Sequence, residues 1–116
     1  MKLEVGQFAR LKSGYICKII NINNFREPNM KYGVEANYLK DIMFIGDDYV
    51  VKASYNIIDI LEKGDYVNGH RIEEIDFDDE EIFTDSEYYC GVVEFCNIKS
   101  VITHEQMEQM AYKVGD

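Results

Sequence analysis

One stretch decides the fold class: Leu61-Glu62-Lys63-Gly64-Asp65-Tyr66-Val67-Asn68-Gly69-His70-Arg71-Ile72. It joins the end of an apolar run to a glycine turn and then to a tight hairpin. Asn68-Gly69 is a strong hairpin signal, because both residues tolerate the positive φ angles of a type I′ turn. The stretch therefore predicts a β-hairpin, and it contains no catalytic motif.

A shorter form of this stretch occurs near the N-terminus. Glu4-x-Gly6-x-Phe8-Ala9 matches Glu62-x-Gly64-x-Tyr66-Val67 at an offset of 58 residues, half the chain. At 116 residues the chain has the usual size of one domain. We predict one compact domain over residues 1–116, with two similar β halves, 1–60 and 61–116, as the alternative.

Runs rich in β-branched and aromatic residues outside this stretch predict further strands. Residues 5–11 and 15–22 read as one hairpin, and residues 42–45 and 49–53 as a second. Strands are also expected in five other segments: 31–36, 70–77, 82–84, and a pair at 88–95 and 98–102.

Two segments favour helix over strand. Residues 57–61 favour a single helical turn, and Thr103-His104-Glu105-Gln106 is a capping box that begins a short C-terminal helix. The expected fold is mainly β, either a small twisted antiparallel sheet or SH3-like barrel halves, with one short C-terminal helix.

The charge is concentrated in one segment. The net charge is −10, from 22 acidic and 12 basic residues. Nine of the acidic residues lie between Glu73 and Glu87, where there is no base, so 13 acids face 12 bases elsewhere. A negative surface argues against direct nucleic-acid binding, which needs positive charge.

The acidic segment is the candidate binding site. Its carboxylates can stand in for phosphates in the Lys/Arg channel of a nucleic-acid enzyme, or they can form a solvated edge that prevents strand pairing between molecules. The candidate partner-binding residues are Glu73, Glu74, Asp76, Asp78, Asp79, Glu80, Glu81, Asp85, Glu87 and Tyr88. A calcium loop from Asp76 to Glu87 is a weaker alternative, because Glu81 stands where such a loop needs glycine.

No catalytic, metal or cofactor site is expected. His70 lies beside a hairpin turn and His104 at a helix start, where polar surface residues are usual. The three cysteines, Cys17, Cys90 and Cys96, contain no C-x-x-C pair. With no apolar N-terminal region and no run long enough to span a membrane, we expect a cytoplasmic protein.

Two phrases carry a family resemblance. They are Ser54-Tyr55-Asn56-Ile57-Ile58-Asp59-Ile60-Leu61-Glu62-Lys63-Gly64-Asp65-Tyr66-Val67-Asn68-Gly69 and Ile98-Lys99-Ser100-Val101-Ile102-Thr103-His104-Glu105-Gln106-Met107-Glu108. With them the chain resembles small proteins carried by phages and prophages of low-GC Gram-positive bacteria. The resemblance implies an accessory protein made in the host cytoplasm, and some small acidic proteins of that setting block host defence nucleases.

Charge, absent catalytic motifs and resemblance together give one functional hypothesis. We expect a non-enzymatic protein that inhibits a host nucleic-acid-handling defence protein through its acidic surface, in an anti-CRISPR-like role. The expected partner is a host protein with a basic surface, such as a nuclease or CRISPR effector, with no direct nucleic acid and no membrane. The alternative is a structural or assembly module that self-associates, for example as a homodimer.

Overall fold

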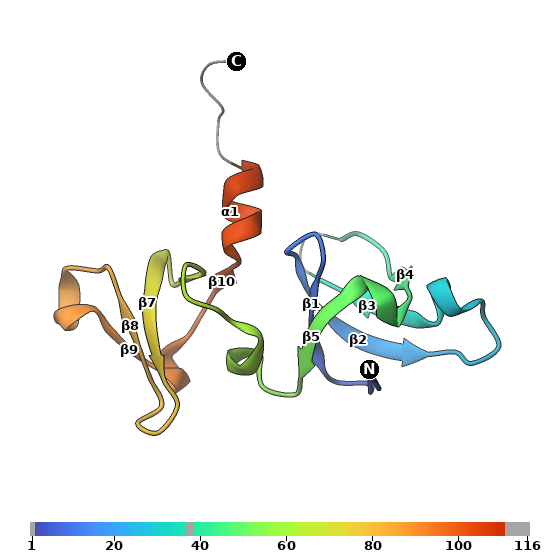
Figure 1. Ribbon diagram of the computed structural model, residues 1–116, viewed down its shortest axis with the longest axis horizontal. Coiled ribbons are helices and arrows are strands. Elements are labelled where there is room, and N and C mark those ends of the chain that lie inside the picture. Colours follow the sequence, from blue (N-terminus) through green and yellow to red (C-terminus); the bar gives the residue numbers. More distant parts are fainter. Residues whose placement is uncertain (1, 37–38, 111–116) are drawn as a thin grey trace, which may run out of the picture. The chain divides into compact units, whose positions relative to one another are not determined.

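The computed structural model describes residues 2–36 and 39–110. The chain divides into two compact units, Met1–Ile60 and Leu61–Asp116. Each unit contains one five-stranded antiparallel sheet, and in the described part of the chain one short α-helix follows the second sheet (Figure 1). The predicted mainly β fold with a short C-terminal helix is confirmed.

The first unit contains strands β1 to β5. They are β1 (Phe8–Leu11), β2 (Ile16–Ile22), β3 (Tyr32–Glu35), β4 (Met43–Ile45) and β5 (Val50–Ser54). The strand order is β4-β3-β2-β1-β5. Short 3₁₀ turns occupy Pro28–Met30, Asp47–Tyr49 and Ile57–Ile60, the last of which confirms the predicted helical turn.

The core of the first unit lies on one face of its sheet. Alternate residues of β2 are buried, among them Cys17 and Ile19, because successive side chains of a strand point to opposite faces. They pack with buried residues of the other strands and of the N-terminal segment: Leu3, Ala9, Leu11, Tyr32, Val34, Ile45 and Val50.

Cys17 should be protected from thiol reagents. Burial raises the pKa of its thiol to about 12, whereas Cys90 and Cys96 are exposed. At about pH 8 we expect rapid labelling of the two exposed cysteines and labelling of Cys17 only after unfolding, because the thiolate is the reactive form. Peptide mass spectrometry measures this, and rapid labelling of Cys17 in folded protein would contradict it.

The buried Cys17 thiol also makes the stability of the fold depend on pH. In the unfolded chain the Cys17 thiol ionises around its ordinary value of 9.0, whereas in the folded chain it stays protonated up to about 12. The unfolded state therefore loses this proton first. We expect the contribution of Cys17 to stability to be complete below pH 9 and to fall as the pH rises towards 12.

The second unit contains strands β6 to β10 and the helix. They are β6 (Tyr66–Val67), β7 (His70–Asp76), β8 (Glu81–Thr84), β9 (Val92–Glu94), β10 (Val101–Ile102) and α1 (His104–Met110). The strand order is β10-β6-β7-β8-β9. Short 3₁₀ turns occupy Tyr88–Gly91 and Phe95–Asn97.

Both units use the same strand order. In each, the first strand pairs with the second and the fifth, the fourth strand lies at the far edge, and a 3₁₀ turn comes just before the fifth strand. Each sheet keeps two edge strands, so within the described residues neither half closes into a barrel. The predicted antiparallel sheets are present as two open sheets.

The hairpin that decided the fold class forms as predicted. Tyr66 pairs with Arg71 and Val67 with His70, which leaves Asn68-Gly69 as a two-residue loop. Their φ angles are 51° and 85°, so both residues lie in the left-handed region that a type I′ turn requires.

The capping box at the start of α1 also forms as predicted. The Thr103 hydroxyl accepts a hydrogen bond from the Gln106 amide, and the Gln106 side chain accepts one from the Thr103 amide. The helix ends its described part at Met110, seven residues after the cap. None of the helices in the described ranges has the length and apolar character needed to cross a bilayer.

Two predicted strand pairs are wrong, and for the same reason. The strands near 42–45 and 49–53 were expected to pair with each other, as were those near 88–95 and 98–102. Instead β4 and β9 pair with the preceding strand, whereas β5 and β10 cross to pair with the first strand of their unit. The 3₁₀ turn before the last strand redirects the chain, so no hairpin forms there.

Two glycines of the second unit, Gly69 and Gly91, should lose different amounts of stability when replaced by alanine. A Cβ at Gly91, whose φ is 74°, would lie 2.5 Å from the Thr84 carbonyl oxygen, whereas a Cβ at Gly69 has no neighbour within 4 Å. We expect Gly91→Ala to lower the free energy of unfolding by about 3 kcal/mol, and Gly69→Ala by about 1 kcal/mol for the left-handed backbone alone. Urea unfolding measures both, and equal losses would contradict the steric explanation.

Candidate functional site

The structure places the acidic segment on one hairpin of the second unit. Strand β7 carries Glu73, Glu74 and Asp76, and the turn and strand β8 carry Asp78, Asp79, Glu80 and Glu81. Asp85 and Glu87 follow β8, and Tyr88 begins the next 3₁₀ turn. All ten side chains are exposed or half-exposed, and Tyr88 is 76% exposed.

Two of these acids have a structural task. The Asp76 carboxylate accepts hydrogen bonds from the amides of Asp78 and Asp79, which closes the turn. The Asp85 carboxylate accepts one from the Arg71 amide. The segment of the calcium-loop alternative, from Asp76 to Glu87, contains a turn closed by Asp76 and then strand β8, with Glu87 beyond the end of that strand.

Three carboxylates form a row across three strands. Asp76 on β7 pairs with Glu81 on β8, and Glu81 pairs with Glu94 on β9. Directly paired residues of antiparallel strands have their side chains on the same face, so this carboxylate row lies on one side of the sheet. Sequence reasoning missed Glu94, since only the register of β8 and β9 brings it to the row.

Reversing the central charge of the carboxylate row should stabilise the fold. Like charges directly opposite each other are unfavourable, so we expect Glu81→Lys to raise the free energy of unfolding by about 1 kcal/mol at low salt and by less at high salt. The matched control is Glu74→Lys, because Glu74 pairs with Phe83 and not with an acid. Urea unfolding at two salt concentrations measures both, and a destabilised Glu81→Lys variant would contradict the row.

A second cluster forms around His104. Pairing of β6 with β10 brings the turn at Glu62–Asp65 beside the start of α1. The Asp65 side chain is fully buried, and its carboxylate accepts hydrogen bonds from the amides of Glu62 (2.7 Å) and His104 (2.8 Å). The turn and the helix are therefore joined through one buried carboxylate.

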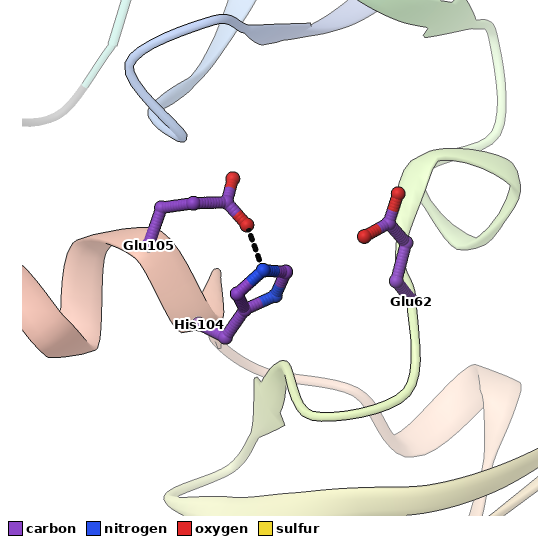
Figure 2. A group of neighbouring side chains, drawn as sticks. All are labelled: Glu62, His104 and Glu105. Atoms are coloured by element: carbon purple, nitrogen blue, oxygen red, sulfur yellow. Dashed lines mark ion pairs between the residues drawn. The ribbon is translucent and has the colours of Figure 1, made fainter.

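The imidazole of His104 lies between carboxylates. Its Nδ1 is 2.9 Å from Asp65 Oδ1, and its Nε2 is 2.5 Å from Glu105 Oε1. Glu62 lies across from this pair, and one ligand atom of each of Glu62, His104 and Glu105 falls within 4.8 Å of the others. Figure 2 shows Glu105 and His104 reaching from α1 towards the same space as Glu62.

The first unit contains the same turn with different chemistry. There the Gln7 side chain accepts the Glu4 amide, as Asp65 accepts the Glu62 amide in the second unit. Tyr55, which follows β5, donates to the Glu4 carboxylate, and this hydrogen bond raises the pKa of the Tyr55 phenol. The turn therefore folds without an imidazole or a buried acid.

Sequence reasoning assigned His104 to a helix surface and did not connect it with Glu62, Asp65 or Glu105. His104 lies 42 residues from Glu62, and only the pairing of β6 with β10 makes them neighbours. The available signal was the echo at the N-terminus, where Gln7 stands in the place of Asp65. The charged Asp65, at the position where the first unit has the neutral Gln7, distinguishes the turn of the second unit from that of the first.

Comparisons with known proteins provide no relative. A scan against protein-family models, a search of curated proteins and a search of solved structures each return no match. The function must therefore be inferred from the residues of this chain.

Proposed function

We propose that this chain is a non-enzymatic binding protein whose acidic hairpin, residues 73–87, docks on a basic surface of a nucleic-acid-handling protein. The observation that carries the proposal is the carboxylate row of Asp76, Glu81 and Glu94. Neighbouring strands lie about 4.8 Å apart, so the row presents closely spaced negative charges in fixed positions.

The carboxylate row favours a binding role because it opposes folding. Like charges directly paired across strands reduce stability, and Lys and Arg side chains of a partner would offset that repulsion. The remaining exposed acids of the hairpin extend the negative field and accelerate association with a positive surface. A merely solubilising edge needs charge, but it does not need three carboxylates in register.

Two exposed aromatic residues accompany the acids, one within the acidic segment and one just after it. Phe77 is 55% exposed at the end of β7 and contacts Phe95 edge-to-face, with ring centroids 6.0 Å apart. Tyr88 is exposed directly after Glu87, the last acid of the segment. Aromatic residues provide apolar contact area in protein interfaces, so the hairpin combines charge with two aromatic contacts.

The resemblance to phage and prophage proteins supplies the biological setting of the proposal. In that setting the partner is a defence nuclease of a bacterial host, met in the host cytoplasm, and the role is anti-CRISPR-like. Carboxylates that occupy the Lys/Arg channel of such an enzyme would compete with its nucleic acid.

The test compares two variants that lose the same charge. The hairpin variant replaces Asp78, Asp79, Glu80 and Glu81 by serine and leaves Asp76 and Asp85 in place. The control variant replaces four exposed acids of the first unit by serine: Glu27, Asp41, Asp47 and Asp48. Each protein is used for capture from bacterial lysate, and the captured partner is then purified and assayed for nuclease activity and DNA binding.

We expect the native protein and the control variant to capture the partner and displace its DNA at about 150 mM salt, and the hairpin variant to do neither. Undiminished capture by the hairpin variant at low salt would refute the acidic mechanism. A closed oligomer in light scattering, with no nuclease captured, would favour the alternative of a self-associating assembly module.

A further inference from the structure

Three lone-pair donors converge at the start of α1, apart from the acidic hairpin. They are His104 Nε2 and one carboxylate oxygen each of Glu62 and Glu105. The closest two, His104 Nε2 and Glu105 Oε1, lie 2.5 Å apart. At this distance the two atoms share a hydrogen bond, and a cation that binds both of them would take the place of the shared hydrogen.

Asp65 determines which nitrogen offers its lone pair. Because Asp65 Oδ1 accepts the His104 amide hydrogen, it also faces the ring Nδ1 as an acceptor, at 2.9 Å. A ring that binds a metal ion through Nε2 carries its hydrogen on Nδ1, where Asp65 accepts it, and its Nε2 lone pair then points towards Glu105 and Glu62. A carboxylate that holds the far nitrogen of an imidazole is the usual support of a metal-binding histidine.

We propose that Glu62, His104 and Glu105 bind one divalent transition-metal cation, with Asp65 as the residue that orients the imidazole. One nitrogen and two oxygen donors suit Zn²⁺ best and Mn²⁺ less well, because Ca²⁺ and Mg²⁺ prefer oxygen ligands alone. The two ligating carboxylates balance the charge of the ion. Three protein ligands leave further coordination positions for water.

The first unit shows that the fold does not require these residues. At the equivalent turn Gln7 stands in the place of Asp65. The side chain that contacts Glu4 there is Tyr55, which follows β5, and not a histidine. That turn has no imidazole and no buried carboxylate, yet it makes the same backbone hydrogen bonds. The metal site is therefore expected in the second unit alone.

Metal binding should also stabilise the second unit. Glu62 precedes β6, whereas His104 and Glu105 begin α1, so a bound ion would connect the two ends of this unit. A cation that binds the folded state and not the unfolded chain raises the melting temperature. This effect is independent of the acidic hairpin and of any partner protein.

The experiment is calorimetric titration of the full chain with Zn²⁺, Mn²⁺ and Ca²⁺ chloride, followed by thermal unfolding with each ion. Cys90 and Cys96 are replaced by serine throughout, because exposed thiols bind zinc themselves. We expect one Zn²⁺ per chain, weaker binding of Mn²⁺, no saturable binding of Ca²⁺, and a rise in melting temperature with Zn²⁺.

Matched variants separate the site from its surroundings. His104→Gln and Glu105→Gln should each weaken Zn²⁺ binding by about 100-fold. Their controls are His70→Gln and Glu108→Gln, which remove a histidine 4.0 Å from Asp85 and a second glutamate of α1. Both controls, and the serine variant of the acidic hairpin, should bind Zn²⁺ as the parent does.

Far-UV circular dichroism and amide exchange confirm that each variant is folded before titration. The proposal is overturned if the parent shows no saturable Zn²⁺ binding, or if His104→Gln binds Zn²⁺ as tightly as His70→Gln. It is also overturned if binding disappears with the hairpin acids and not with Glu105. None of these outcomes bears on whether the hairpin binds a basic partner.

Discussion

Replacing Asp65 by alanine should lower the free energy of unfolding of the second unit by about 4 kcal/mol. The Asp65 side chain is fully buried and accepts hydrogen bonds from two backbone amides and one imidazole nitrogen. Hydrogen bonds to a charged acceptor are each worth about 1.5–3 kcal/mol, and alanine leaves the donors without that acceptor. The loss is therefore larger than for a typical surface acid.

Asp65→Asn tests whether the stability depends on the charge of the Asp65 side chain or on its shape. An amide offers one acceptor oxygen, and its NH₂ group would face a backbone N–H donor on the other side. We expect Asp65→Asn to lose nearly as much stability as Asp65→Ala. Urea unfolding combined with amide exchange in β6 and β7 measures the effect, because exchange reports each unit separately.

Two controls define the scale of the Asp65 effect. Gln7→Ala removes the neutral counterpart in the first unit, which accepts one amide at 2.9 Å, and should cost about 1 kcal/mol. Asp78→Ala removes an exposed acid of the second unit and should change stability by less than about 0.5 kcal/mol. If Asp65→Ala costs no more than Gln7→Ala, the buried carboxylate does not join the turn to the helix.

Local sequence patterns predicted the parts of the fold that depend on few residues. The left-handed pair Asn68-Gly69 determines a two-residue loop, because other residues rarely adopt both conformations. The capping box at Thr103 and Gln106 determines the helix start, because the two residues satisfy each other's backbone amides. In both places the physical cause lies within four residues of its effect.

The two wrong strand pairs show that local sequence patterns do not determine which strands pair. Strands β4 and β5, like β9 and β10, are separated by a few residues, which favoured a hairpin. Their actual partners are chosen by the edges already present in the sheet, since the first strand offers a free edge to the last one. Such pairing joins residues far apart in sequence, and no local signal records it.

Each of the two candidate sites depends on a strand pairing that local sequence patterns did not predict. The nine clustered acids were visible in the sequence, but the carboxylate row required Glu94, which the register of β8 with β9 supplies. The His104 cluster required the pairing of β6 with β10. Composition therefore located the charged hairpin, whereas strand register determined which carboxylates face each other and which imidazole they surround.

The largest effect in the first unit should come from Arg10. This residue lies on β1, its side chain is 2% exposed, and its Nη1 donates to the Ile60 carbonyl oxygen at 3.0 Å. Ile60 ends the 3₁₀ turn that closes the unit, so the guanidinium connects the middle of the sheet with the last turn. A buried cation is tolerated only where hydrogen bonds compensate for its lost hydration.

We expect Arg10→Met to lower the free energy of unfolding of the first unit by about 3 kcal/mol. Methionine retains the length of the apolar stem, but it leaves the Ile60 carbonyl without this donor. The free energy of unfolding of Arg10→Lys should lie between that of the native protein and that of Arg10→Met. An ammonium group keeps the charge but loses the planar set of donors. Amide exchange in β1 and β2 under increasing urea measures the loss in this unit.

The matched control for Arg10 is Lys18→Met on β2. Lys18 is exposed, with its Nζ 5.7 Å from the Phe8 ring centroid, and its replacement should change stability by less than about 0.5 kcal/mol. A stabilised Arg10→Met variant would show that dehydrating the guanidinium costs more than its hydrogen bonds return. In that case apolar packing alone would hold the Ile57–Ile60 turn against β1, and the buried arginine would oppose the fold.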